Sequence, residues 1–362
     1  MSSAGWLRGR GSTGPRGPGP PRTQLAAPAG GGRPPAPPPP PPPGGPRRTM
    51  LPGRTPPGRP TTAAEPRRPG RRSFGDSLVG WAMVSPSVLL IGVFGLVPVV
   101  WSFVLSFQHS DLQTPATSAG LANYRELVHD PLFVASVRHT LVYTAIFVPV
   151  TLLLSLLAAA ALNRRIRGIS VYRLAFFIPV VTSTVATGVI FTWLLDPAFG
   201  FVNMSLAKVG LPTSGFFSSP HAALLSVVAM TVWGWTGFGA LIYLAGLQGT
   251  PSDVLEAAQI DGCSRTGAFW RVQVPLLRPV TGFLTVWLTI NALQVFDEIF
   301  VTTRGGPLNA TNVVVYYLYR QAFEFFHAGY AAAMATVLFV IIALVTWAQS
   351  RFTGDATSAE RP

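Results

Sequence analysis

The 362-residue sequence is poor in the residues that carry most enzyme chemistry. Cys263 is the only cysteine, so no disulfide can form within the chain. Lys208 is the only lysine and follows alanine, whereas a Walker-type phosphate-binding loop needs Gly-Lys-Ser or Gly-Lys-Thr. The Gly-x-Ser-x-Gly signature of serine hydrolases is absent, and none of the five histidines is spaced as a metal-binding pair. These absences predict a chain that is not an enzyme and holds no metal or cofactor.

Charge is also scarce, and much of it lies at one end of the chain. Only 11% of the residues are charged, 49% are hydrophobic and the mean hydropathy is +0.39, a combination that is rare in soluble domains. Thirteen of the 26 arginines precede Ser73 and only Glu65 opposes them there, so the net charge of +13 mostly describes this tail. The composition therefore predicts a membrane protein with a basic N-terminal extension.

The N-terminal tail, residues 1–75, is dense in proline, glycine and arginine and contains an unbroken proline run at 37–43. Such a segment buries too little apolar surface to offset the entropy of ordering, so we expect disorder, with polyproline II favoured in the proline run. No folded platform or interleaved aromatic residues accompany the arginines, so we expect contact with anionic lipid and no binding of nucleic acid. A start of translation at Met50, which would leave much of the tail unmade, stays open.

A helix that spans a bilayer needs about twenty mostly apolar residues. Six stretches meet this requirement, at 81–107, 140–162, 174–195, 222–244, 280–300 and 331–349. Tryptophans near several of their ends are typical of the aromatic belts at membrane interfaces. We therefore predict an all-α membrane protein. Its six transmembrane helices lie in residues 76–350, and a short tail follows at 351–362.

The positions of the basic residues predict how these helices are oriented, because cytoplasmic loops collect Lys and Arg. With the N-terminus inside, nine basic residues beyond the tail fall on the cytoplasmic side and five on the outer side. The clearest marker is the cluster of Arg164, Arg165 and Arg167 after the second stretch. We expect a multi-pass protein of the cell membrane with both termini in the cytoplasm, and the loop at 247–279 on the same side.

The loop at 247–279 is longer than a simple connection requires, and its sequence indicates a fold of its own. The segment from Thr250 to Asp253 resembles a capping box with proline at the first helical position. Gly262 suits the position just after a helix end. We therefore expect a short helix, a glycine break and a second short helix at about 264–274. A folded loop at a membrane face is typical of a docking element.

Polar residues within the apolar stretches are candidates for a substrate pathway, because intramembrane polar groups are costly and often functional. At helical spacing Asn291, Gln294 and Glu298 share one face, with Asp297 beside it, and the two carboxylates lie near the outer interface. Trp233 and Trp235 flank a glycine in the fourth stretch, and aromatic faces of this kind stack on sugars. The alternatives are an interhelical hydrogen bond for the two amides, simple hydration for the two carboxylates and packing against lipid or helices for the tryptophans.

The loop also resembles a known family. Gly246-Leu247-Gln248, Pro251, Glu256-Ala257-Ala258, Asp261-Gly262, Phe269 and Pro275 are similar to the EAA loop of permease subunits in binding-protein-dependent ABC importers. The resemblance implies the MetI-like permease fold, in which this loop forms coupling helices that seat in a cytoplasmic ATPase. The implied coupling residues are Glu256, Ala257, Ala258, Asp261, Gly262, Phe269 and Pro275. The implied partners are a second permease subunit, an ABC ATPase dimer that hydrolyses the ATP, and an extracytoplasmic solute-binding protein.

Further matches narrow the resemblance to the carbohydrate uptake group, of the maltose and glycerol-3-phosphate type. They include Asp130-Pro131, Phe177-Ile178-Pro179, Val232-Trp233, Gly305-Gly306-Pro307 and Ala310-Thr311. His139 and Cys263 depart from the asparagine and alanine that are usual in the family. The implied function is the permease of an ATP-driven importer whose substrate is a sugar. A permease for a peptide or polyamine, an ion-driven secondary transporter and a membrane-embedded enzyme are the alternatives.

Overall fold

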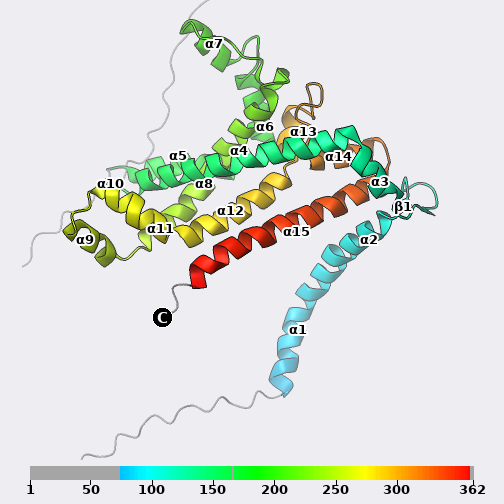
Figure 1. Ribbon diagram of the computed structural model, residues 1–362, viewed down its shortest axis with the longest axis horizontal. Helices are drawn as coiled ribbons and strands as arrows, with labels where there is room; N and C mark the ends of the chain where they lie inside the picture. Colours follow the sequence, from blue (N-terminus) through cyan, green and yellow to red (C-terminus); the bar gives the residue numbers. More distant parts are fainter. Residues whose placement is uncertain (1–73, 165–166, 359–362) are drawn as a thin grey trace, which may run out of the picture. The chain divides into compact units, whose positions relative to one another are not determined.

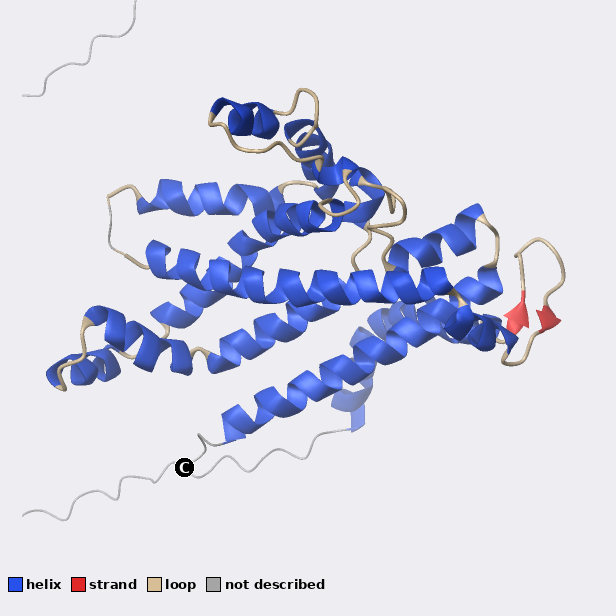
Figure 2. Ribbon diagram, turned by 45° about the horizontal axis from the view of Figure 1, so that its top comes forward, coloured by secondary structure: helices blue, strands red, loops and turns tan. Residues whose placement is uncertain are grey.

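The computed structural model describes residues 74–164 and 167–358, and these are almost entirely helical (Figure 1). Of the predicted disordered tail, residues 1–75, all but the last two lie outside the described part, and these two, Phe74 and Gly75, begin α1. Among the described residues the only strands form a two-residue hairpin, in which Gln108 pairs with Ser118 and His109 with Thr117 (Figure 2). The all-α prediction is confirmed apart from this small hairpin.

The elements follow one another as helices of very different length. In chain order they are α1 (Phe74–Leu90), the π-helical η1 (Ile91–Leu96), α2 (Val97–Leu105), β1 (Gln108–His109), β2 (Thr117–Ser118), α3 (Ala122–His129), α4 (Pro131–Leu162), α5 (Ile169–Val181), α6 (Thr184–Leu194), α7 (Phe201–Lys208), the 3-10 turn η2 (Phe216–Ser218), α8 (Ala223–Gln248), α9 (Ser252–Ile260), α10 (Arg265–Ala268), the π-helical η3 (Phe269–Gln273), α11 (Val274–Leu276), α12 (Arg278–Leu293), α13 (Asp297–Thr302), α14 (Val314–Tyr319), the π-helical η4 (Arg320–Glu324) and α15 (Ala328–Ser358).

Four of the described helical segments are long and apolar enough to cross a membrane without interruption: Trp81–Leu105, Pro131–Leu162, Ala223–Gln248 and Ala328–Arg351. Two further spans are possible by length and composition if each of two bent helix pairs crosses once, which gives up to six. Four of the six predicted stretches correspond to these continuous helices, and the third corresponds to the first bent pair, α5 and α6. The second pair bends by 63° at Leu277, before the fifth predicted stretch, which contains only its second member, α12.

The third predicted stretch is not a straight helix. The chain turns by 100° between α5 and α6, at a break formed by Thr182 and Ser183. Pro179 removes one backbone donor inside α5, and Thr182 leaves the helix with extended backbone angles. The Thr182 hydroxyl donates to the carbonyl of Ile178 at 2.7 Å, so part of the freed backbone is paired again. Hydropathy measures composition and carries no information on this change of direction.

The fifth predicted stretch is also interrupted. Helix α12 ends at Leu293, and Gln294 caps it with its backbone nitrogen bonded to the carbonyls of Ile290 and Asn291. A separate helix, α13, starts at Asp297. The prediction of one helix over 280–300 is therefore wrong in its last third, where polar residues break the apolar run.

The centre of the bundle is the long contact between α4 and α8, with α12 beside α4 and α15 beside α12 (Figures 1 and 2). The Ser155 hydroxyl on α4 donates to the carbonyl of Thr236 on α8 at 3.1 Å. Gly237 permits the close approach of α5, because a Cβ there would collide with the carbonyl oxygen of Phe176. Buried Tyr143, Val227 and Leu288 belong to one core cluster that these helices share.

The first span packs differently from the others. None of the side chains from Trp81 to Leu105 is buried. Its contacts with the rest of the bundle are made near its C-terminal end, where α2 lies against α15 and the hairpin. An apolar helix of this kind is suited to a lipid environment or to a neighbouring membrane subunit.

Candidate functional site

The loop between α8 and α12 is folded as a short helix followed by a second helical segment. The first helix, α9, ends in a Schellman motif, with the Gly262 nitrogen bonded to the carbonyl of Gln259 at 3.0 Å and the Cys263 nitrogen to that of Ala258 at 2.9 Å. Gly262 has φ +85°, which L side chains rarely adopt. Ser264 then caps α10 by accepting from the Gly267 nitrogen at 3.1 Å. The expected helix, glycine break and second helix are all present.

The start of this loop differs in detail from the prediction. Helix α9 begins at Ser252, with Pro251 as its capping residue, and no side chain caps it. The Thr250 hydroxyl instead donates to the carbonyl of Gly246 at 3.4 Å, on the preceding helix. The expected capping box is therefore wrong, because the Thr250 hydroxyl bonds back to α8 and not to the nitrogens of α9.

The seven predicted coupling residues fall into an exposed group and an anchoring group. Four of them, Glu256, Ala257, Asp261 and Gly262, are exposed, and Ala258 is half-buried. Phe269 is half-buried and packs against the cluster that contains Leu247 and Leu277, so it ties the loop to the bundle. Pro275, also half-buried, lies in the first turn of α11.

This loop exposes large apolar side chains that the sequence pattern did not predict. Ile260, in the last turn of α9, is 86% exposed, and Trp270 is 47% exposed. A β-branched aliphatic residue left open to this degree on a folded loop is a candidate contact for a partner protein. The signal in the sequence was an isoleucine directly before Asp261-Gly262, in a segment that is otherwise small or polar.

Beside α12 lies a polar cavity of about 240 Å³, to which α4, α6, α8 and α13 also contribute. A second cavity, of about 270 Å³, adjoins it on the side of the bend between α5 and α6. The two share Thr184, Thr231, Trp235 and Glu298. Three of the four predicted pathway residues, Asn291, Gln294 and Asp297, line the first cavity.

Trp233 lies elsewhere. It lines an apolar groove among α4, α5 and α8, and its ring packs against Phe191 with the centroids 5.4 Å apart. Trp235, two residues later on α8, lines both the first and the second cavity and meets Phe238 edge-on at 5.8 Å. Residues two apart on a helix point to nearly opposite sides, so only one of this pair can face the cavities.

Local hydrogen bonds hold the polar side chains of the cavity wall. Asn291 donates from Nδ2 to the carbonyl of Trp287 at 2.8 Å, and the Thr231 hydroxyl donates to that of Val227 at 2.9 Å. The hydroxyl oxygen of Thr231 can still accept a hydrogen bond from a ligand. The wall therefore offers acceptors and aromatic rings in fixed places.

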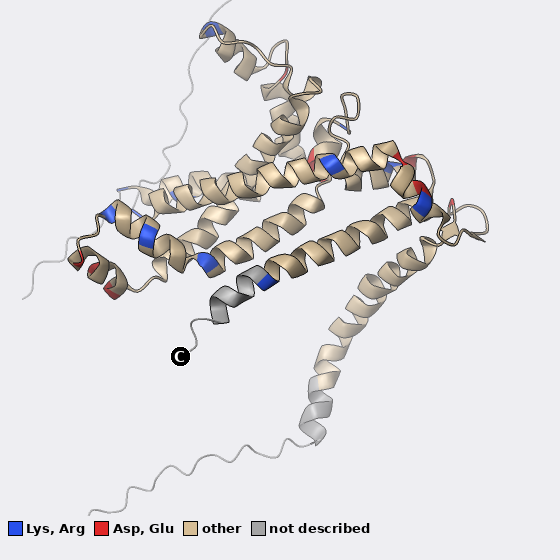
Figure 3. Cartoon of the chain, viewed as in Figure 1, with Lys and Arg blue, Asp and Glu red and all other residues tan. Residues whose placement is uncertain are grey.

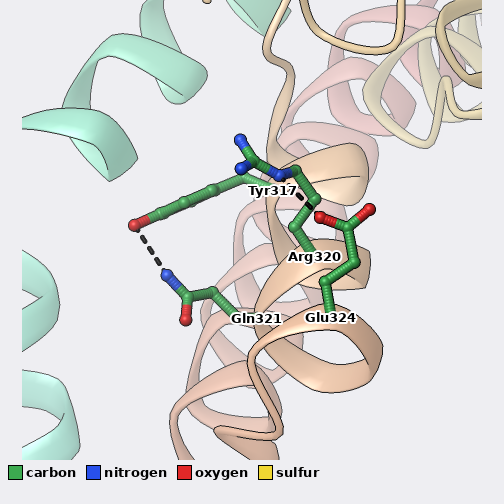
Figure 4. A network of polar contacts seen from close by, with 4 residues as sticks. All are labelled: Tyr317, Arg320, Gln321 and Glu324. Atoms are coloured by element: carbon green, nitrogen blue, oxygen red, sulfur yellow. Dashed lines mark hydrogen bonds and ion pairs between the residues drawn. The ribbon is translucent and has the colours of Figure 1, made fainter.

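A buried polar network ties three elements together at the opposite end of the bundle from the folded loop. Asp130 Oδ1 accepts from the Leu132 nitrogen at 2.8 Å and so caps α4, while its Oδ2 accepts from the hydroxyls of Tyr317 and Tyr330, both at 2.7 Å. Gln321 Nε2 donates to the Tyr317 hydroxyl at 2.8 Å (Figure 4). On the same segment Arg320 and Glu324 form an exposed ion pair at 3.0 Å.

Burial alone would raise the pKa of the Asp130 carboxyl, but the hydrogen bonds from the two tyrosines and from the backbone nitrogens of Leu132 and Phe133 together outweigh it, so the pKa lies below its ordinary value. Burial and the bond to Asp130 raise the pKa of Tyr317 to about 12. The network is therefore strongest when Asp130 is ionised and Tyr317 is neutral.

Among the described residues, no group of three His, Cys, Asp or Glu side chains could hold a metal ion.

Membrane-spanning helices around a polar cavity, with a folded loop projecting between two of them, define a membrane transport subunit. A family model described as binding-protein-dependent transport system inner membrane component matches residues 140–354. The chain belongs to this family and is an ABC transporter permease, in a family of transport subunits that are not enzymes.

Similar proteins cover most of the chain. A lactose transport system permease protein of Rhizobium radiobacter is 33% identical over 276 residues, which are 75% of this chain and 92% of that protein. An sn-glycerol-3-phosphate transport system permease protein of Agrobacterium fabrum is 31% identical over 281 residues, 77% and 96% of the two chains. The fold resembles a chain of a bacterial alginate ABC transporter crystallised with an alginate-bound periplasmic protein, with TM-score 0.70, 20% identity and coverage of 78% and 97%.

Proposed function

We propose that this chain is a transmembrane subunit of an ATP-driven importer for sugars, and that the two adjoining cavities lie on the path of the solute. The observation that carries the proposal is the composition of their lining. Hydroxyl and amide groups of Thr184, Thr231, Asn291 and Gln294 stand next to the ring of Trp235. Such a mixture of aromatic surface and a few placed polar groups suits a hydroxyl-rich solute with apolar ring faces.

The similar proteins support this class of solute. One is named for lactose, another for sn-glycerol-3-phosphate, and the solved transporter for alginate. These names include a neutral disaccharide and anionic compounds, so they leave the charge of the solute open.

The folded loop is proposed as the coupling element. Helix α9 presents Glu256 and Ala257 beside the open side chain of Ile260. Glutamate can pair with a cation or a backbone nitrogen of the partner, and alanine lets the partner approach closely. The partner is a dimer of cytoplasmic ABC ATPases, because this chain has no Gly-Lys-Ser/Thr phosphate loop of its own.

Two more protein partners and the lipid complete the assembly. A second permease subunit forms the other wall of the pathway, and a solute-binding protein delivers sugar at the outer face. The exposed apolar side chains of the spanning helices, including those from Trp81 to Leu105, contact lipid or the second permease.

The proposed orientation places the coupling loop and both termini in the cytoplasm. Arg265, Arg271 and Arg278 lie on or beside the loop, and Arg351 lies at the end of the last span (Figure 3). This matches the preference of basic residues for the cytoplasmic side. A maleimide that cannot cross membranes should label Cys263 only in broken cells, and labelling in intact cells would contradict this orientation.

One observation favours a different solute. Asp297 and Glu298 both line the first cavity, and two carboxylates would also suit a polyamine.

A transport assay separates the two solutes. The subunit is purified with its partners, reconstituted in proteoliposomes and tested with labelled lactose, cellobiose, maltose and spermidine. ATP-dependent uptake of one or more of the sugars supports the proposal, and uptake of spermidine alone overturns it. Replacement of Asn291 by Ala should change the affinity or selectivity for the solute more than the assembly of the complex.

A further inference from the structure

The charged residues around the two cavities all have the same sign. The uncharged polar groups come from α6, α8 and α12 and their flanks, and the aromatic surface from Tyr143, Trp235, Phe296 and their neighbours. The only ionisable groups that can carry charge near neutral pH are the carboxyls of Asp297 and Glu298. Among the described residues that line either cavity there is no lysine, arginine or histidine.

The basic residues that follow α13 in the sequence do not supply the missing charge. Arg304 follows α13 and is exposed without lining either cavity. Arg320 forms its ion pair with Glu324 and lies over the ring of Phe325, at 5.1 Å from the centroid. Helix α13, with six residues, has its first turn occupied by its own Asp297 and Glu298, so its N-terminus offers no free positive potential to a ligand.

Moving an anion from water into such a cavity costs free energy that no positive charge offsets. Proteins recognise carboxylates and phosphates with arginine or lysine, since charge-assisted hydrogen bonds replace the lost hydration. Here the anion would lose water in a membrane-embedded space and face two carboxyl groups. In either protonation state Glu298 leaves the anion without a positively charged partner, because a protonated carboxyl also provides no cation.

We propose that this permease discriminates by charge, admitting neutral saccharides and rejecting anionic ones such as uronates and sugar phosphates, with Asp297 and Glu298 as the residues that enforce the rejection. This inference rests on the proposed sugar pathway and adds the charge class of the solute to it. The carboxyl groups have a second use, because they accept hydrogen bonds from the hydroxyls of a neutral sugar.

The test measures binding to the purified complex of this chain with its partner permease and ATPase, without the solute-binding protein, whose own selectivity would otherwise mask that of the membrane site. Labelled lactose, cellobiose and maltose are each compared with the uronate in which one hydroxymethyl group is a carboxylate. Equilibrium dialysis gives the ratio of dissociation constants for each pair. Three variants are measured beside the wild type: the double change Asp297→Asn with Glu298→Gln, the single change Gln294→Arg, and the control Glu126→Gln. Glu126 is an exposed carboxylate on α3 that lines neither cavity.

In the wild type at least one neutral sugar should bind about tenfold or more tightly than its uronate, since facing like charges are strongly unfavourable. The dissociation constant of the uronate divided by that of the neutral sugar should fall toward one in the double variant. It should fall further in Gln294→Arg, which places a cation in the cavity wall, and stay unchanged in Glu126→Gln. Retained binding of the neutral sugar shows that each variant is folded. Equal binding of sugar and uronate in the wild type, or an unchanged ratio in the double variant, overturns the charge filter while leaving the sugar pathway in place. If neither member of any pair binds, the sugar pathway itself is overturned, and the charge filter with it.

Discussion

Tyr317 donates a hydrogen bond to Asp130 at 2.7 Å, across 187 positions of sequence, and so joins α14 to the residue that caps α4. Tyr330, at the start of α15, reaches the same carboxylate oxygen. One side chain therefore fixes the ends of three helices, and its removal leaves two buried hydroxyls without their acceptor.

Replacement of Asp130 by Asn should lower the melting temperature of the purified protein. Hydrogen bonds to a charged group contribute about 1.5–3 kcal/mol each when buried, and the partial exposure of Asp130 places the effect at the lower end. Light scattering or nanoscale fluorimetry in detergent measures the shift. The control is Glu126→Gln, which removes an exposed carboxylate nearby on α3. Equal melting temperatures for the Asp130 variant and the wild type would show that the network does not stabilise the fold.

The same network predicts a dependence of stability on pH at both ends of the range. Because the pKa of Asp130 is lowered in the folded state, its contribution is present above the ordinary value of 3.8 and is lost as pH falls through the folded value. Because the pKa of Tyr317 is raised from 10.0 to about 12, its contribution is lost as pH rises between these two values. The variant Tyr317→Phe should flatten the alkaline limb of the melting-temperature profile, and an unaltered limb would contradict the assignment.

Replacement of Gly262 by Val should abolish uptake while the protein still inserts into the membrane. A β-branched residue at φ +85° costs roughly 1–3 kcal/mol and would open the Schellman motif at the end of α9. Glu256→Lys should have the same effect by reversing the charge of the exposed helix. Uptake and the amount of membrane-embedded protein are measured together.

A matched control for this change exists on the other side of the bundle. Gly210, after α7, has φ +76° and open space around it, so Gly210→Val imposes the same backbone strain far from the coupling loop. Uptake should survive in this variant. If both glycine variants lose uptake equally, general strain explains the loss and the docking assignment is not supported.

Replacement of Gly237 by Ala should destabilise the bundle, because the new Cβ would collide with the carbonyl oxygen of Phe176 on α5. Overpacking of this kind typically costs about 1–3 kcal/mol. The control is Gly234→Ala, one turn earlier on α8, where a Cβ meets nothing within 4 Å. Melting temperatures of the two variants should differ, with only the Gly237 variant lowered, and the reverse order would refute the proposed contact between α5 and α8.

The two tryptophans of α8 give a prediction about the pathway. Trp235→Ala should raise the KM for the transported sugar roughly five- to thirtyfold, the effect of losing 1–2 kcal/mol of binding. Trp233→Ala should leave KM near the wild-type value, because this ring packs in the apolar groove. Uptake kinetics over a range of sugar concentrations distinguish the two. A larger effect at Trp233 would mean that the solute passes on the other side of α8.

The sequence predicted the apolar stretches and the folded loop, because composition and local chemistry decide both. A spanning helix is recognised by its run of apolar residues, and Gly262 by its place after a helix end. The 100° bend at Thr182 and Ser183 could not be predicted from the sequence, since many proline-containing membrane helices continue almost straight. The packing of neighbouring helices decides whether such a helix breaks, and packing is not local.

In the candidate site, too, local sequence predicts some residues, and packing between distant segments decides the others. Asn291, Gln294 and Asp297 were found because polar residues in an apolar stretch are conspicuous, and all three line the first cavity. Of the two tryptophans that flank Gly234, the sequence pattern favoured Trp233, whereas Trp235 lines the cavities, because only the positions of α4 and α5 determine which face of α8 is covered. The partners of Asp130 lie 187 and 200 positions away, and no sequence spacing points to them.

The scarcity of reactive side chains has a practical consequence. Lys208, exposed at the end of α7, carries the only side-chain amine, and Cys263, half-buried between α9 and α10, carries the only thiol. A donor dye and an acceptor dye can thus be attached to the native sequence at two defined points, without engineered sites. Energy transfer between them would follow, in single molecules, changes in the distance between the proposed coupling loop and α7.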